Sequence, residues 1–222
     1  MKHYLSYSLA GVALLANAAY AGGMEGYGVP DNMTFYGGAS IGGVNQDGAC
    51  DVVDNTHDCK KPNNGYKVFA GTRFAPMYDA QTLPSVGAEM GYIDFGESTS
   101  QGEILSERGF SLGDANVSNN VSSTYLAGVG YLPVAPNTEL IGKAGLALWQ
   151  QDGKVAVPED SALNSNSTNS GLGTLLGAGA QYRVNDNLSV RGEYEQVFDT
   201  AKDTSYKTDA SLYSVGAVFS TY

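Results

Sequence analysis

The sequence has 222 residues, including 29 glycines and 15 tyrosines, and its 12 basic and 23 acidic residues give a formal charge of −11. So acidic a chain repels phosphate backbones, which excludes nucleic acid as a partner. No run of about 18 apolar residues occurs, so a membrane-spanning helix is excluded, whereas a membrane-spanning sheet, whose signal is alternation, is not.

Residues 1–21 predict a secretory signal peptide. Lys2 gives a weakly basic start, a small apolar stretch runs from Leu9 to Ala19, and Ala19-Tyr20-Ala21 fits the small-x-small pattern cut by signal peptidase. A buried N-terminal helix is the alternative interpretation. We therefore expect cleavage after Ala21 and a single domain over residues 22–222.

Export changes what the two cysteines predict. Cys50 and Cys59 lie in a polar, acidic stretch, and an even cysteine count in an exported chain favours a disulfide across that loop. The alternative is a metal site formed by both sulfurs, His57 and a nearby aspartate. An oxidising compartment favours the disulfide, so no metal is expected.

The remainder of the chain shows alternation rather than helical periodicity. Eight segments carry apolar or small residues at every second position, which places each set on one side of a strand. In chain order, these sets run from Phe35 to Ile41, Tyr66 to Phe74, Val86 to Tyr92, Tyr125 to Tyr131, Leu140 to Leu148, Leu172 to Tyr182, Leu188 to Phe198 and Tyr213 to Phe219. The pattern predicts an all-β, eight-stranded antiparallel up-and-down barrel.

The opposite strand faces are small or charged. They carry Lys67, Arg73, Glu89, Lys143, Gln181, Arg191, Glu193 and Glu195, separated by glycine and serine. A lipocalin-like barrel would hold the apolar faces inside around a ligand, whereas an outer-membrane barrel would turn them toward lipid. Aromatic residues near strand ends favour the second arrangement, because they fit interfacial girdles: Tyr66, Phe74, Tyr92, Tyr131, Tyr182 and Phe198. Glycine also fits, since a narrow lumen filled by long charged side chains needs small neighbours.

Long and short connections alternate along the chain. The short ones fall at Pro76–Leu83, Pro133–Asn137 and Asn185–Asn187 and contain the residues of tight turns. The long ones are polar, and Gln151–Ser170 is expected to be a mobile, low-complexity loop. This alternation is typical of an outer-membrane meander with short periplasmic turns and longer outer loops.

Several fragments, in order, resemble one family. Gly65–Phe95, and within it the Val-Gly-x-Glu-Met-Gly-Tyr core at Val86–Tyr92, resembles the second and third strands of the transmembrane domain of enterobacterial outer membrane protein A. Tyr125–Gln150, with Gly-Tyr-x-Pro at Gly130–Pro133 and Trp149, is similar to the fourth and fifth strands. Gly177–Phe198, with Arg191-x-Glu193-Tyr194, is similar to the sixth and seventh.

The resemblance implies an outer-membrane location, in contact with lipids and lipopolysaccharide. It also implies a C-terminal signal for the barrel-insertion machinery at Gly216, Phe219 and Tyr222, although Thr221 departs from the expected apolar residue. The family's best-known member continues into a peptidoglycan-binding domain, and because this sequence ends at its last strand that tether is not expected here. Of the family's two lumen ion pairs, one matches Glu89 and Arg191, whereas the other falls on the uncharged Gly128 and Gln181.

The candidate site is therefore a lumen charge network of Arg73, Glu89, Lys143, Arg191, Glu193 and Glu195. Glu193 and Glu195 are two residues apart on one strand, so both point inward, roughly 7 Å apart. Mutual charge compensation is the favoured interpretation. A gate or narrow conduction path is the alternative, in which case replacing Arg191 by alanine would leave Glu89 unpaired and raise conductance.

No catalytic residue and no cofactor is expected. Apart from His3, the only histidine is His57, which lies between Asp54 and Asp58 in the first outer loop. An Asp–His pair can activate water, but a surface histidine among acids is usually only solvated. The favoured function is non-enzymatic: envelope integrity, or contact with a host or surface ligand through the outer loops. The alternatives are a narrow porin-like channel gated by Glu89 and Arg191, and a soluble periplasmic lipocalin-like binder.

Overall fold

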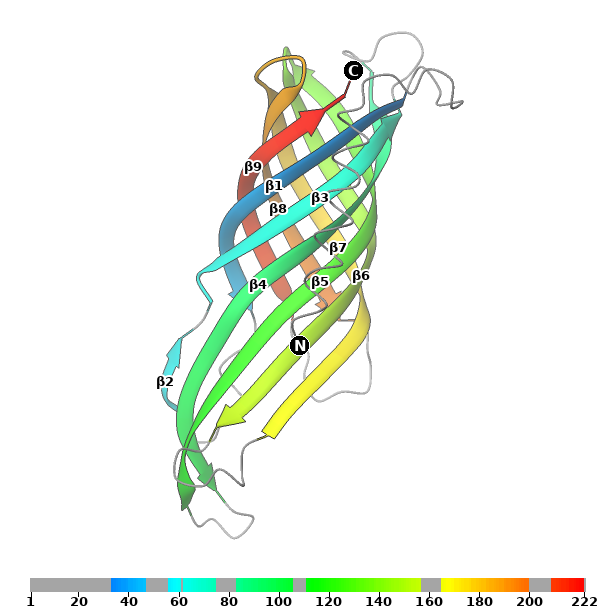
Figure 1. Ribbon diagram of the computed structural model, residues 1–222. Helices are drawn as coiled ribbons and strands as arrows, with labels where there is room; N and C mark the ends of the chain where they lie inside the picture. Colours follow the sequence, from blue (N-terminus) through cyan, green and yellow to red (C-terminus); the bar gives the residue numbers. More distant parts are fainter. Residues whose placement is uncertain are drawn as a thin grey trace.

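The fold is that of a tall, tilted barrel (Figure 1), seen in a computed structural model that describes residues 33–46, 56–60, 62–74, 83–105, 111–156, 165–199 and 209–221. Side chains are described in these ranges except at 56–59, 101–105, 111–115 and 199. The expected signal peptide, Cys50, Tyr222 and the side chains of His57 and Cys59 lie outside the described part. The expected cleavage site and disulfide therefore stay predictions.

Nine strands make up the described chain. They are β1 (Met33–Gln46), β2 (Thr56–Lys60), β3 (Asn64–Phe74), β4 (Ser85–Leu105), β5 (Ser111–Ala135), β6 (Thr138–Ala156), β7 (Ser165–Arg183), β8 (Leu188–Asp199) and β9 (Ala210–Ser220). No helix among the described residues is long and apolar enough to cross a membrane. The short strand β2 was not predicted, and it pairs only with β4.

Eight of these strands close into a barrel. Each pairs antiparallel with its sequence neighbours, and β1 pairs with both β3 and β9, so the first and last long strands seal the sheet. All hydrogen-bonding edges are thereby satisfied within the barrel wall, as crossing a lipid bilayer requires. The predicted eight-stranded up-and-down barrel is confirmed.

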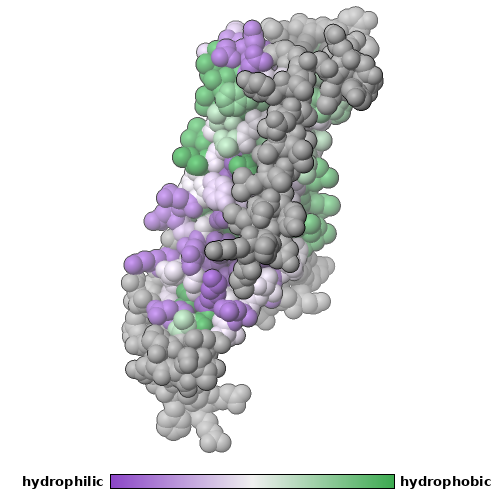
Figure 2. Space-filling view, viewed as in Figure 1, coloured by the Kyte–Doolittle hydropathy of each residue, from purple (hydrophilic) through white to green (hydrophobic). Residues whose placement is uncertain are grey.

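The outer wall of the barrel is apolar. Large hydrophobic side chains are exposed on every long strand, among them Ile41, Val86, Met90, Leu126, Leu140, Leu146, Leu176, Val190, Val215 and Phe219. Figure 2 shows hydrophobic side chains in the upper part, below a hydrophilic rim, and hydrophilic side chains again lower down. A lipocalin-like binder would bury these side chains around a ligand, so their exposure excludes that alternative and fits a lipid-facing belt.

One strand faces the opposite way from the prediction. Tyr125 and Tyr131 of β5 are each only 2% exposed and point into the lumen, together with Ala127 and Val129. Leu126, which is 64% exposed, and Leu132 form the lipid face instead. Both faces of β5 are apolar, so alternation alone could not choose between them. Tyr131 is accordingly not a residue of the aromatic girdle.

Four strands continue well past the lipid-facing belt. With about 3.3 Å per residue, the 25-residue β5 is far longer than the roughly 9–11 residues that cross a membrane. We call residues 93–105, 111–123, 149–156 and 165–171 the outer extension; in Figure 1 it forms the lower end of β4–β7. It lies opposite the short turns β5–β6 and β7–β8, hence on the extracellular side.

The expected loop Gln151–Ser170 is therefore wrong over most of its length. Gln151–Ala156 belongs to β6 and Ser165–Ser170 to β7, and the two runs pair from Gln151 with Asn169 to Val155 with Ser165. Serine, threonine and asparagine are common in turns. Here, however, the hydrogen-bonded pairing of β6 with β7 keeps the register set within the barrel and continues through these residues. Likewise, β4 and β5 pair as far as Leu105 and Ser111, across most of the long connection expected between the strands that contain Tyr92 and Tyr125.

Candidate functional site

The barrel encloses a compact set of buried charges at its mid-height. This lumen cluster contains three cations and three carboxylates contributed by four strands: Lys67 (β3), Glu89 (β4), Lys143 (β6), Arg191, Glu193 and Glu195 (β8). Every member is at most 7% exposed. The formal charges cancel, which is the condition under which ionised groups remain buried.

Glu89 is the central acceptor. Its Oε1 receives hydrogen bonds from Lys143 Nζ at 2.6 Å and from the Tyr125 hydroxyl at 2.7 Å. Its Oε2 receives them from Arg191 at 2.8 Å and from the Tyr36 hydroxyl at 3.0 Å. Removing Arg191 would therefore leave Glu89 with three donors, so Glu89 and Arg191 do not form an isolated pair that a single substitution could open.

The second half of the cluster joins two lysines to two glutamates. Lys143 lies 2.6 Å from Glu193 Oε1 and 3.1 Å from Glu195 Oε1. Lys67 contacts Glu193 and reaches Glu195 Oε2 at 2.6 Å. The two carboxylates, two residues apart on β8, are thus held by the same pair of ammonium groups, and Lys143 links them to Glu89.

Glycines on the neighbouring strand make room for these carboxylates. In the β7–β8 register, Gly177 is opposite Glu195 and Gly179 is opposite Glu193. A Cβ atom added to Gly179 would lie 2.8 Å from Cγ of Glu193, and one added to Gly177 would lie 3.1 Å from Cγ of Glu195. At these two positions, glycine lies beside a long charged side chain in the lumen, which is the arrangement that the sequence predicts.

An aromatic ring lies against all three cations. Phe69 is 2% exposed, and its ring centre is 4.7 Å from Lys67 Nζ, 5.0 Å from the Arg191 guanidinium carbon and 5.4 Å from Lys143 Nζ. Desolvated cation–π contacts of this kind contribute on the order of 1–2 kcal/mol. Phe69 therefore helps to stabilise the positive half of the cluster.

Arg73, which the sequence placed in the same network, lies apart from it. Its guanidinium forms a two-pronged pair with Glu139, at 2.8 and 2.9 Å, and donates to Ser85 Oγ at 2.8 Å. Arg183 approaches the same carboxylate at 3.8 Å. This second group lies near the short turns, at the periplasmic mouth, and is separate from the mid-height cluster.

The second ion pair implied by the resemblance would fall on Gly128 and Gln181, and neither residue carries a charge. Gly128 is exposed on the lipid face of β5, between the inward-facing Ala127 and Val129, so it does not occupy a lumen position. Gln181 does face the lumen and accepts a hydrogen bond from Arg191 Nε at 2.8 Å. Lys67 instead pairs with Glu193 and Glu195.

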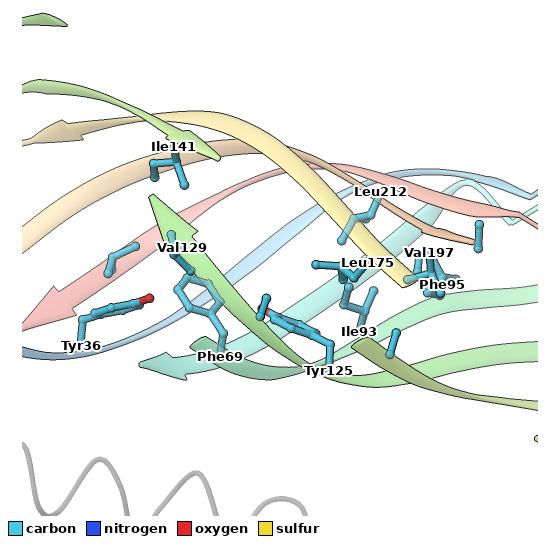
Figure 3. Packing of buried hydrophobic residues seen from close by; sticks show 14 of the residues in the cluster. Tyr36, Phe69, Ile93, Phe95, Tyr125, Val129, Ile141, Leu175, Val197 and Leu212 are labelled. Atoms are coloured by element: carbon cyan, nitrogen blue, oxygen red, sulfur yellow. The ribbon is translucent and has the colours of Figure 1, made fainter. Parts of the chain in front are cut away.

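Apolar side chains fill the lumen on the extracellular side of the cluster. Figure 3 shows several of them converging from different strands. We call this set the outer plug: Ile93, Phe95, Val121, Leu175, Val197 and Leu212, none more than 6% exposed. A narrow lumen packed with such side chains excludes a continuous column of water at this level.

The described residues contain no group of three or more His, Cys, Asp or Glu side chains able to hold a metal ion. The lumen carboxylates are each bound to cations, an arrangement that stabilises their charge rather than freeing it for proton transfer.

Of the expected insertion signal, Gly216 and Phe219 lie on β9, with Phe219 exposed on the lipid face.

Sequence reasoning missed several members of the two charged groups and their support. Lys67 is on the predicted polar face but was given no role, and the residues not singled out are Glu139, Arg183, Phe69 and the two donors Tyr36 and Tyr125. Lys67 and Phe69 share the parity of Arg73 on β3, so alternation could have found them. Glu139 directly follows a turn, where a charged residue is normally expected to be exposed to solvent. Its partner Arg73 is distant in sequence, so no local pattern indicates the ion pair.

A sequence-family model described as the OmpA-like transmembrane domain matches residues 30–221. Outer membrane protein A of Yersinia pseudotuberculosis is 25% identical over 218 residues, which cover 97% of this chain and 53% of that protein. Outer membrane protein P5 of Haemophilus influenzae is 28% identical over 179 residues, covering 75% and 45%. The chain thus spans about half the length of these curated relatives.

Among solved structures, the attachment invasion locus protein Ail of Yersinia pestis is similar, with a TM-score of 0.46 and 13% identity. The similarity covers 85% of this chain and 96% of that one.

Proposed function

Because the chain belongs to the family of OmpA-like transmembrane domains and is an outer-membrane β-barrel, we propose that it is a non-enzymatic envelope protein whose outer extension contacts ligands at the cell surface. The barrel itself serves as a rigid anchor in lipid and lipopolysaccharide. The lumen cluster stabilises that anchor from within.

The outer extension is the observation that carries this proposal. Beyond the belt, the outward faces of β4–β7 become polar, and Thr99, Lys154 and all side chains from Ser165 to Ser170 are exposed. Hydrogen bonds tie neighbouring strands together, for example from Thr168 Oγ1 to Asp152 at 2.7 Å and from Ser118 to Glu97. An ordered, paired sheet held away from the membrane offers a defined surface for recognition.

The filled lumen supports an anchoring role over a conducting one. The outer plug and the mutually satisfied lumen cluster leave the narrow barrel interior occupied by side chains. The carboxylates that could have served in catalysis are all engaged by cations. These features favour a structural barrel and argue against a channel gated by Glu89 and Arg191.

Two further parts of the proposal concern assembly. Gly216 and Phe219 on β9, together with Tyr222, are proposed to be read by the barrel-insertion machinery, because the aromatic Phe219 is presented on the lipid face of the last strand. Cys50 and Cys59 are proposed to form a disulfide after export, which would brace the connection preceding β3.

The test compares the two roles in cells. A strain lacking the protein is complemented with the wild type or with a variant in which residues 152–168 are replaced by a short Asn-Gly turn, which leaves the belt portions of β6 and β7 intact. Envelope integrity is measured as survival in SDS with EDTA, and surface contact as adhesion to epithelial monolayers.

We expect both proteins to restore detergent resistance and only the wild type to restore adhesion. The folded state of each is checked by its shift on unheated gels. Equal adhesion by the trimmed variant would contradict a role for the β6–β7 part of the outer extension, and failure of the wild type to restore either property would contradict the proposed function as a whole.

A further inference from the structure

The outer extension has an unpaired strand edge along the first part of β7. Within the described chain, β6 pairs with β7 from Ser165 onward, whereas β8 pairs with β7 only from Gly173 onward. Among the described strands, residues 165–171 are therefore hydrogen-bonded on one side only, and in Figure 1 this yellow part of β7 forms one margin of the outer extension. At about 3.3 Å per residue, the edge offers roughly 20 Å of N–H and C=O groups to a further strand.

The opposite margin of the same sheet is protected. There the five-residue β2 lies beside residues 99–102 of β4, and its sequence includes the charged Asp58 and Lys60. Short length and charged residues are two of the means by which natural sheets prevent further strand addition. The β7 edge has neither, because residues 165–171 include no charge and no proline, and every side chain from Ser165 to Ser170 is exposed. This edge is therefore open to another strand.

A second copy of the barrel in the same membrane does not fit this edge. Two copies that meet edge to edge in one membrane are related by a two-fold axis along the membrane normal. Because barrel strands are tilted by roughly 35–45°, the two β7 edges would cross at roughly 70–90°. Adjacent strands of a sheet diverge by only about 20–25°. An extended segment of another protein has no such restriction, since it can adopt the direction of the edge.

The side chains around the edge favour an uncharged partner. The nearest charges on β6 are Asp152, opposite Thr168, and Lys154, opposite Asn166, so the two signs are balanced. The edge itself carries only hydroxyl and amide side chains before Gly171. Such side chains form hydrogen bonds with hydroxyl groups directly opposite them on a neighbouring strand. The complementary segment is therefore rich in serine, threonine and asparagine.

We propose that residues 165–171 bind an extended, uncharged segment of a partner protein, rich in serine, threonine and asparagine, which adds as a further strand beside β7. In strand addition of this kind, backbone hydrogen bonds supply the affinity and side chains supply the specificity. The inference rests on the proposed surface role of the outer extension and names the edge that performs it.

The experiment titrates the folded protein in lipid nanodiscs into a fluorescent peptide, Ser-Asn-Ser-Thr-Asn-Ser-Gly, and follows binding by fluorescence anisotropy. A matched peptide carries N-methyl groups on the threonine and the following asparagine, so that each edge of the peptide loses one N–H donor. We expect the methylated peptide to bind about tenfold more weakly, as the loss of a backbone hydrogen bond predicts.

Two double variants test where the peptide binds. Ser167→Lys with Asn169→Lys places two like charges on the edge and is expected to weaken binding about tenfold. Asn116→Lys with Gln150→Lys is the control, because it adds the same charges to exposed positions of β5 and β6 that are paired on both sides. Gel shift verifies folding of each variant.

Binding by the wild type and the control variant, with loss for the methylated peptide and for the edge variant, would support strand addition. Equal binding of the methylated peptide, unchanged binding by the edge variant, or no binding to the wild type at millimolar peptide would overturn it. Slow hydrogen exchange of all amides of residues 165–171 in the peptide-free protein would also overturn it, since the edge would already be covered. Wild-type adhesion without peptide binding removes only this inference, whereas wild-type failure to restore adhesion contradicts the proposed surface role itself.

Discussion

Glu89 is the residue on which the lumen cluster depends most. It accepts hydrogen bonds from two cations and two tyrosines and is fully buried. Replacing it with glutamine preserves its shape but leaves Lys143 and Arg191 short of a counter-charge. Removing one partner from a buried ion network costs about 3–5 kcal/mol.

We therefore expect Glu89→Gln to lower the free energy of unfolding by an amount of that order, measured by urea titration of the folded protein in lipid vesicles. Glu97→Gln is the control, because Glu97 is exposed on the outer extension. If the two variants unfold at the same urea concentration, the lumen cluster does not stabilise the barrel.

Glycine at position 179 is a second residue-scale requirement. A Cβ atom there would lie 2.3 Å from the Gly192 carbonyl oxygen and 2.8 Å from Cγ of Glu193, whereas one at Gly142 would meet nothing within 4 Å. Overpacking of this kind costs about 1–3 kcal/mol.

Gly179→Ala is thus expected to destabilise the barrel in the same urea titration, and Gly142→Ala to leave it unchanged or slightly more stable. Equal stability of the two alanine variants would show that β7 and β8 can separate to admit the methyl group at no cost.

At the scale of elements, the orientation of β5 is the feature that sequence alternation left ambiguous. Leu126 faces lipid. Asn120 lies six residues before it on the same face of β5, beyond the belt. An arginine on the lipid face costs about 2–4 kcal/mol at the bilayer midplane and about 0–1 kcal/mol near the interface.

Leu126→Arg is therefore expected to reduce the stability of the vesicle-inserted barrel by a few kcal/mol, and Asn120→Arg to have little effect. The comparison is made by urea titration in the same vesicles. A harmless Leu126→Arg would mean that β5 is turned over, with its tyrosines toward lipid.

For the whole molecule, the outer plug and the lumen cluster together close the barrel. We expect the wild-type protein to show no stable conductance steps in planar bilayers. Replacing both Leu175 and Leu212 with serine hydrates the plug and should introduce small, brief openings, because the barrier on the extracellular side is then polar. The double variant Leu172→Ser and Leu176→Ser, on the lipid face of β7, is the control. Steady conductance in the wild type would contradict a closed barrel.

Much of the fold could be predicted from the sequence, because every strand of a membrane barrel alternates between lipid-facing and lumen-facing residues. The lipid-facing positions of β3, β4, β6, β7, β8 and β9 followed from alternation, since each has one clearly apolar face. Arg191, Glu193 and Glu195 fell on the inner face for the same reason. The rule failed at β5, where Tyr125 and Tyr131 are apolar enough to pass for lipid-facing residues yet serve the lumen through their hydroxyl group or ring.

The order of the long strands and the lipid-facing side of every long strand except β5 were therefore determined by the sequence itself, because period-2 patterning and turn residues are local signals. Only the tertiary structure decided which charges meet, since Lys67 and Glu193 are 126 residues apart and join only when the barrel closes. It likewise separated Arg73 from the cluster and gave it to Glu139. The polar run Ser165–Ser170 became a strand because β6 lay beside it in register, a cause that no local preference for turns could reveal.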